Sequence, residues 1–91
     1  LKKVRDSFTV CNDKGLHTRP STELVKCTVR YRSQINLICQ KAVVDAKSLL
    51  GILALAATKG TKIKVEAFGD DAEEAVSEIL ALAANKFNVK Y

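Results

Sequence analysis

Apolar and polar residues alternate in three separated stretches of the chain, a pattern typical of half-buried β-strands. These stretches cover residues 7–10, 35–39 and 62–67. A shorter apolar pair, Val43 and Val44, predicts a fourth strand. Gln40 and Lys41 lie between the second stretch and this pair, where they form a weak hairpin signal because the usual Gly is missing. The pattern therefore predicts four strands, two of them joined by a tight turn.

Apolar residues recur at helical spacing in the segments between these strands. The first helix follows the turn formed by residues 12–15, and Pro20 suits its first turn because the missing N–H of proline costs nothing there. A second helix is short and apolar, with Ser48 as its N-cap. We expect this second helix to continue through Ala56 and to stop by Gly60.

A third helix has a long apolar face after the last strand. Asp70 and Glu73 have the spacing of a capping box at its start. Its apolar face is formed by Ala72, Ala75, Val76, Ile79, Leu80, Ala83 and Phe87. The resulting order, β-α-β-β-α-β-α, predicts a mainly antiparallel sheet with helices over one face. We expect a single α+β domain over residues 1–91, without repeats or linkers.

Composition adds limits to this fold. The 91 residues are 47% hydrophobic but only 5% aromatic, without Trp or Met, so the core is expected to be aliphatic. No apolar run approaches the roughly 20 residues of a membrane-spanning helix, and the N-terminal residues do not resemble a signal peptide. We therefore expect a cytoplasmic monomer.

The three cysteines are Cys11, Cys27 and Cys39, an odd number at wide spacing. They predict buried, reduced thiols and neither a disulfide framework nor a metal site. The formal net charge of +5 favours acidic partners, either a protein surface or a nucleic acid. Because the positive residues are scattered, solvated faces account for most of this charge.

His17 is the only histidine, and it stands just before the predicted first helix. Free N–H groups at a helix N-terminus disfavour a charged imidazolium and also bind anions. A neutral ring nitrogen is a nucleophile, and the guanidinium of Arg19 adds donors for phosphate oxygens. Gly15 allows the backbone to turn into the site. These residues suit a phosphohistidine better than an acid–base catalyst, although an incidental structural histidine remains the alternative.

Three segments resemble the HPr phosphocarrier family of the bacterial phosphoenolpyruvate-dependent sugar phosphotransferase system. They are Gly-Leu-His-Thr-Arg-Pro-Ser at 15–21, Ala-Lys-Ser-Leu-Leu-Gly-Ile at 46–52 and Ala-Thr-Lys-Gly-Thr-Lys-Ile at 57–63. The resemblance runs from about residue 8 to residue 87 and keeps the order and spacing of the segments. It implies an open-faced β-sandwich, with a four-stranded antiparallel sheet covered on one face by three helices.

The resemblance also implies a function. His17 would accept a phosphoryl group on Nδ1 from phosphorylated Enzyme I and pass it to a histidine on a sugar-specific IIA domain. Arg19 would stabilise the group in transfer, next to the helix N-terminal residues Thr18, Pro20 and Ser21. The protein would be a stoichiometric carrier and not a turnover enzyme, without metal or organic cofactor.

Ser48 matches the regulatory serine of the family, which a dedicated HPr kinase/phosphorylase modifies in many members. Phosphate would add about −1.5 to −2 charge at a helix start, on the surface that meets acidic partners. Plain N-capping is compatible with this role. Leu49, Leu50 and Leu53 crowd a very short helix, and we expect some of them to form an exposed patch for docking Enzyme I and IIA.

Two positions depart from the family pattern. Thr18 stands where Ala is common, and its hydroxyl is available to cap the helix or to contact phosphate. Gln40-Lys41 replaces a more typical Asn-Gly turn. Neither change removes a group that transfers phosphate.

Three other functions remain open at this point. One is a nitrogen-regulatory paralogue of the same family. Another is a regulator of transcription-factor partners acting through phosphorylated Ser48. The third, from a different class, is a small basic RNA-binding domain, although such domains stack bases on sheet aromatics that are scarce here.

Overall fold

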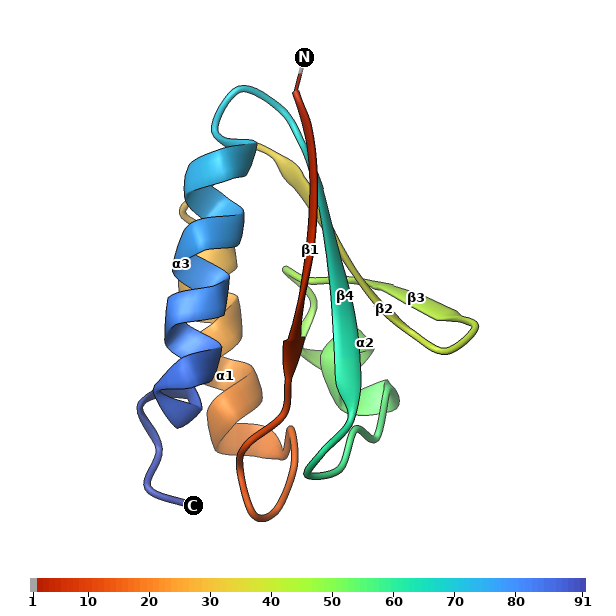
Figure 1. Cartoon of the computed structure of the whole chain (residues 1–91), viewed down its shortest axis with the longest axis vertical. Helices are drawn as coiled ribbons and strands as arrows, with labels where there is room; N and C mark the ends of the chain where they lie inside the picture. The colour runs from red at the N-terminus through yellow and green to blue at the C-terminus, as the bar shows by residue number, and fades with distance from the viewer. Residues whose placement is uncertain (1) are drawn as a thin grey trace.

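The computed structural model describes residues 2–91 and confirms the predicted element order (Figure 1). The elements are β1 (Lys3–Thr9), α1 (Thr18–Thr28), β2 (Gln34–Cys39), β3 (Ala42–Asp45), α2 (Leu49–Ala54), β4 (Lys62–Phe68) and α3 (Ala72–Ala84), followed by a 3-10 turn, η1 (Lys86–Asn88). The three α-helices and the four strands form the predicted α+β architecture. Within residues 2–91 no helix is long and apolar enough to cross a membrane.

The strands form one sheet in the order β1-β4-β2-β3, and every neighbouring pair is antiparallel. Partners across the ladders share a face, and the face toward the helices is apolar apart from the exposed Asp6 of the edge strand β1. Leu37 pairs with Val65, and Phe8 pairs with Ile63, all of them buried. The fully buried Leu24 of α1 belongs to the same core. The alternation in the sequence thus separates this covered face from an open one.

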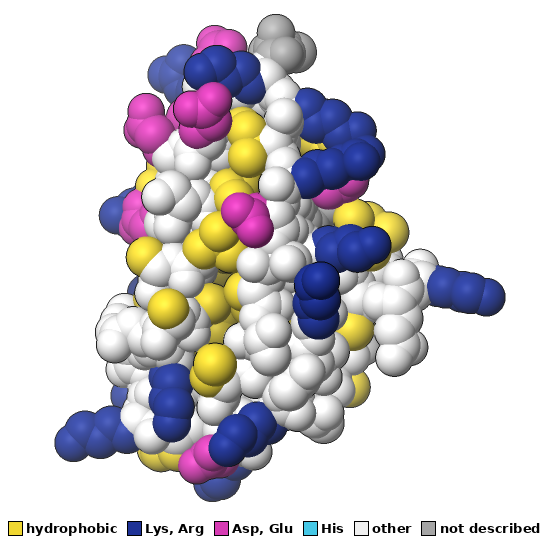
Figure 2. All heavy atoms as spheres, viewed as in Figure 1, with side chains coloured by type: hydrophobic (Ala, Val, Ile, Leu, Met, Phe, Trp, Pro, Cys, Tyr) yellow, Lys and Arg dark blue, Asp and Glu magenta, His cyan; other side chains and the backbone are white. Residues whose placement is uncertain are grey.

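The open face of the sheet is polar and largely positive. Lys64 pairs with Ser7 of β1, while Glu66 pairs with Arg5 and forms an ion pair with its guanidinium at 2.7 Å. Figure 2 shows Lys and Arg side chains gathered on the side of the molecule where β1 and β4 run, while acidic side chains cluster near the start of α3. Part of the positive charge of the chain therefore lies on a solvated sheet surface.

The predicted end of the second helix is wrong. α2 ends at Ala54, with Leu55 as its C-cap, and Ala56 takes a left-handed conformation with φ of 49°. Gly60 does not stop the helix; its N–H donates to the carbonyl of Val10 at 2.8 Å. The apolar spacing continues past the helix because Leu55 still packs against the core from a non-helical segment.

The predicted capping box of the third helix is also wrong. The N-cap of α3 is Asp71, which makes no side-chain cap hydrogen bond. Its carboxylate instead accepts from the Ser33 hydroxyl at 2.5 Å and from the backbone N–H groups of Arg32 and Ser33. These hydrogen bonds, with that of the Ser33 hydroxyl the strongest, lower the pKa of Asp71. Asp71 therefore ties the start of α3 to the loop before β2.

The apolar face of α3 is shorter than predicted at its C-terminal end. α3 ends at Ala84, and Phe87 lies in η1 with φ of 54°. Phe87 is nevertheless fully buried and packs edge-on against Phe8, with ring centroids 5.7 Å apart. The Phe87 side chain thus enters the core from η1 and not, as predicted, from the apolar face of α3.

The β2–β3 hairpin has the predicted two-residue turn, since Cys39 pairs with Ala42. Gln40 supplies the left-handed residue that Gly or Asn more often supplies, with φ of 56°. Of the predicted buried thiols, Cys27 and Cys39 are buried, and burial raises the pKa of Cys27. Cys11 is exposed, which corrects that prediction; it lies in the loop after β1, which ends at Thr9.

Candidate functional site

His17 is the N-cap residue of α1. Its backbone is extended, with φ of −79° and ψ of −169°, and its carbonyl accepts the hydrogen bond of the Ser21 N–H at 3.1 Å. The His17 side chain makes no capping hydrogen bond. The imidazole therefore lies at the start of the helix, and neither of its nitrogens is occupied in capping the helix.

The loop before His17 is fixed against the segment that follows α2. Gly15 takes φ of +69°, and a Cβ there would lie 2.2 Å from the carbonyl oxygen of Ala57. The N–H of Leu16 donates to that same oxygen at 2.9 Å. Lys59 adds an exposed ion pair with Asp13 at 3.1 Å. Glycine is required at position 15 because backbone occupies the space of any side chain.

Ser21 holds the same loop from the helix side. It is fully buried, and its hydroxyl donates to the carbonyl of Leu16 at 3.0 Å. Because the hydroxyl is buried and makes this internal hydrogen bond, it is not free to contact a phosphate. Ser21 supports the proposed phosphate site through the position of the loop.

The first turn of α1 offers free backbone donors. The N–H groups of Thr18 and Arg19 have no acceptor within residues 2–91, and Pro20 has no N–H. The Thr18 side chain is exposed and does not cap the helix, because His17 occupies the N-cap position. The side chain of Arg19 is exposed and forms no ion pair within the same residues. The helix start thus has two free N–H groups, and the exposed side chain of Arg19 belongs to the same turn.

The His17 ring is half-buried and lies nearly parallel to the ring of Tyr91. The ring centroids are 5.6 Å apart, and the planes differ by 19°. The Nε2 atom is sealed from solvent and has no hydrogen-bond partner within residues 2–91, whereas Nδ1 is not sealed. The ammonium of Lys14 lies 5.1 Å from the centroid of the Tyr91 ring. Of the two ring nitrogens, Nδ1 is the one open to a reaction partner.

Sequence reasoning missed Asn12, Lys14 and Tyr91 as parts of this site. Asn12 is fully buried, and its amide donates to the carbonyls of Lys86 at 2.9 Å and Tyr91 at 3.0 Å. These contacts join residues more than seventy positions apart, so no local spacing reveals them. The polar turn around Asn12 is the one available signal, and it indicates a turn without showing its distant partners.

The short helix α2 packs against α1. Ser48 is its N-cap, as predicted, and the hydroxyl accepts from the Gly51 N–H at 3.0 Å. Ile52 is fully buried, while Leu50 is 80% exposed. Leu49 and Leu53 are half-buried. The helix is therefore anchored in the core through Ile52, and its opposite side exposes apolar surface at Leu50.

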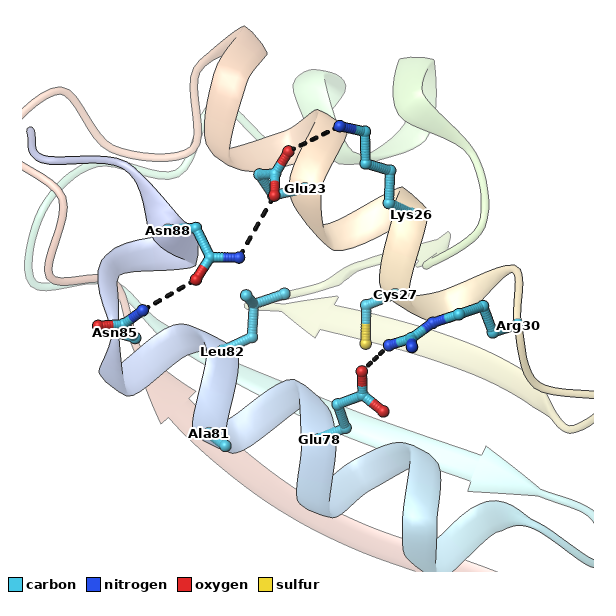
Figure 3. A pocket seen from close by; sticks show the side chains of 9 residues that line it. All are labelled: Glu23, Lys26, Cys27, Arg30, Glu78, Ala81, Leu82, Asn85 and Asn88. Carbon is cyan, nitrogen blue, oxygen red and sulfur yellow. Dashed lines mark hydrogen bonds and ion pairs between the residues drawn. The ribbon is translucent and has the colours of Figure 1, made fainter.

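A groove of about 510 Å³ lies between α1 and α3 (Figure 3). Its charged side chains are paired with each other: Arg30 with Glu78, and Lys26 with Glu23 at 3.0 Å. Asn88 donates to the second Glu23 oxygen at 3.3 Å. Within residues 2–91 no group of three or more His, Cys, Asp or Glu side chains could hold a metal ion. The charged groups that line this groove thus pair with each other.

The fold and the site define an open-faced α+β sandwich with the chain's single imidazole at the N-terminus of its first helix. The chain matches the family model "PTS HPr component phosphorylation site" over residues 4–85. This match shows that the chain belongs to the HPr family.

Relatives and solved structures agree with this assignment. Phosphocarrier protein HPr of Cupriavidus necator is 39% identical over 79 residues, which cover 87% of this chain and 89% of that protein. The multiphosphoryl transfer protein of Haemophilus influenzae is 40% identical over 90% of this chain, which corresponds to 17% of the larger protein. The crystal structure of HPr-C-His from Thermoanaerobacter tengcongensis superposes with a TM-score of 0.89 at 34% identity, covering 100% of both chains.

Proposed function

We propose that this chain is a monomeric, single-domain phosphoryl carrier of a sugar phosphotransferase system, with His17 as its phosphorylated residue. The observation that carries the proposal is the open Nδ1 of His17 at the free N-terminus of α1. The Nδ1 lone pair attacks the phosphorus held by a histidine of Enzyme I, and the bonding pair of the broken P–N bond returns to that histidine. The reverse exchange delivers the group to a IIA histidine.

The positive end of α1 and Arg19 stabilise the group during transfer. The N–H groups of Thr18 and Arg19 are free to donate to phosphate oxygens, and the helix dipole favours negative charge there. The Arg19 guanidinium has a planar fork of donors that matches phosphate geometry. The carrier accepts one phosphoryl group and passes that same group on to its partner. It therefore acts stoichiometrically and needs no metal or organic cofactor.

Partner docking is assigned to the apolar surface of α2. Leu50 is exposed, and Leu49 and Leu53 extend the surface as half-buried neighbours. Enzyme I and IIA domains would cover this surface while they reach His17, since α2 packs on α1. The unpaired cysteines suit a reducing cytoplasm as the place of this exchange.

Ser48 is proposed as the regulatory site of an HPr kinase/phosphorylase. A phosphate on this N-cap hydroxyl keeps an acceptor for the Gly51 N–H, so α2 stays capped. The added charge would stand next to Leu49 and repel the acidic partner surfaces that a chain of net charge +5 favours. Ser48→Asp should slow transfer from Enzyme I, whereas Ser48→Asn, a cap without charge, should not; equal rates would contradict this regulation.

The experiment that tests the carrier function is incubation with Enzyme I and labelled phosphoenolpyruvate. We expect one phosphoryl group per chain, labile in acid and stable in alkali. His17→Ala should take up none, while Thr22→Ala on the same helix serves as a folded control. Persistent label in His17→Ala would show that another residue accepts the group.

A further inference from the structure

The chain reverses direction after α3 and returns to the start of α1. Lys86, Phe87 and Asn88 have consecutive left-handed φ angles of 52°, 54° and 60°. Such angles are unfavourable for Lys and Phe, so the surrounding structure must maintain them. The fully buried Phe87 ring, packed on Phe8, supplies that anchor. The reversal sends residues 89–91 toward the His17 loop.

Two hydrogen-bond systems hold this returning segment, residues 85–91. Figure 3 shows Asn88 between Asn85 and Glu23, with its amide donating to the Glu23 carboxylate at 3.3 Å. Asn12, in the loop before His17, binds the carbonyls at both ends of the return, at Lys86 and Tyr91. The segment is thus tied to both α1 and the loop, and its last contact is the ring of Tyr91 against the His17 imidazole.

We propose that Tyr91 is a positioning residue for His17: its ring holds the imidazole in the orientation in which Nδ1, and not Nε2, meets the phosphoryl donor. This inference rests on the proposed carrier function. The final torsion of a histidine side chain is broad, so an unsupported ring samples many planes. The nearly parallel stack at 5.6 Å limits this rotation, and in the orientation that the stack holds, Nε2 is sealed from solvent while Nδ1 is not.

The stack also suits the charge on the phosphorylated ring. Nδ1 uses its lone pair in the new N–P bond, the donor's N–P bond breaks, and Nε2 keeps its proton throughout. The phosphorylated ring therefore carries a positive charge beside its phosphate. An aromatic face within about 6 Å attracts such a cation, and the Tyr91 ring stands at that distance.

Chemical phosphorylation separates this inference from partner recognition. Phosphoramidate transfers its phosphoryl group to histidine with loss of ammonia and without Enzyme I, and nitrogen–phosphorus couplings in NMR spectra identify the modified nitrogen. Wild type and Tyr91→Phe should give the Nδ1 product almost alone. Tyr91→Leu should raise the share of Nε2 product roughly two- to tenfold. This factor is the change in equilibrium between two ring orientations that corresponds to the free energy of one aromatic pair.

Enzymatic transfer supplies the second readout. In Tyr91→Leu, we expect kcat of Enzyme I toward the carrier to fall by a similar factor with KM unchanged, because the ring is misplaced while α2 is intact. Tyr91→Phe should restore kcat. Val43→Ser, at a 60%-exposed position on β3, is the matched control for an apolar surface substitution. A nuclear Overhauser contact between the His17 and Tyr91 rings in wild type tests the stack without any variant.

An unchanged nitrogen preference and kcat in Tyr91→Leu, a Tyr91→Phe variant as defective as Tyr91→Leu, or the absence of the ring–ring contact would each overturn the positioning role. Failure of the proposed function looks different. In that case wild type takes no phosphoryl group from Enzyme I, although the chemical nitrogen preference still depends on Tyr91.

Discussion

Gly15→Ala tests whether the His17 loop depends on its contact with the segment after α2. Position 15 combines two obstacles to a side chain: a left-handed backbone with φ of +69° and a Cβ position 2.2 Å from the Ala57 carbonyl oxygen and 2.9 Å from Thr58 Cα. Backbone atoms cannot move aside cheaply. The loop must therefore shift, and the hydrogen bond from Leu16 N–H to the Ala57 carbonyl is lost.

Gly60→Ala is the matched control for this substitution. Gly60 is also left-handed, with φ of +90°, but a Cβ there meets nothing within 4 Å. Its substitution should cost about 1–2 kcal/mol of unfolding free energy, the conformational penalty alone. Gly15→Ala adds a lost hydrogen bond of about 1 kcal/mol and displaced packing, for a total of about 3–4 kcal/mol.

Urea unfolding and thermal denaturation measure the difference between the two variants. A gap of about 2 kcal/mol corresponds to about 8–16 °C in Tm for a domain of this size. Displacement of His17 by about 1 Å should also slow phosphoryl transfer by about a hundredfold in Gly15→Ala, with Gly60→Ala near wild type. Equal stabilities and transfer rates in the two variants would refute the idea that the loop is fixed on Ala57.

Three further predictions concern other parts of the molecule. The hydrogen bond from the Ser33 hydroxyl, followed by those from backbone N–H groups, keeps the pKa of Asp71 below its ordinary value of 3.8, so its stabilisation is complete above that value and is lost as pH falls through the native pKa. Asp71→Asn should therefore lower Tm at neutral pH, with a gap from wild type that closes in acid; a gap independent of pH would contradict this. Cys11 should be the one cysteine that iodoacetamide modifies quickly in the native protein, because the other two thiols are buried; rapid modification of two or three thiols, measured by mass spectrometry, would show that the burial is wrong. Leu50→Ser should raise KM of Enzyme I for the carrier several-fold with little change in Tm, because this side chain is 80% exposed; the same KM as in Val43→Ser would remove α2 from the docking surface.

The sequence was sufficient for the fold because each covered strand position is apolar and each element has its own period. Ile63 and Val65 on β4 are buried, and their neighbours Lys62 and Lys64 are exposed, as the alternation predicts. The ends of the helices were less predictable. Ala56 and Phe87 continue the apolar pattern of α2 and α3, yet both take left-handed angles outside those helices. Tertiary packing, which local spacing does not encode, decides where these helices stop.

The candidate site divides in the same way. His17 and Arg19 could be selected from the sequence as candidates, because an anion site that reacts needs a nucleophile and a cation at a helix start. Tyr91 and Asn12 were not, because they join the site only through the reversal after α3. Tyr91 contacts the site because the fold brings it back to His17 from more than seventy positions away. No motif near His17 predicts such a long-range contact.

Onward transfer from a purified phosphorylated carrier tests whether His17 is a phosphoryl relay. The chain is labelled by Enzyme I and phosphoenolpyruvate, separated from both, and mixed with an unlabelled IIA domain. We expect the label to move from His17 to a IIA histidine, leaving an unmodified carrier that accepts a second phosphoryl group. Label that stays on the carrier, or appears only as inorganic phosphate, would contradict the role of His17 as a phosphoryl relay.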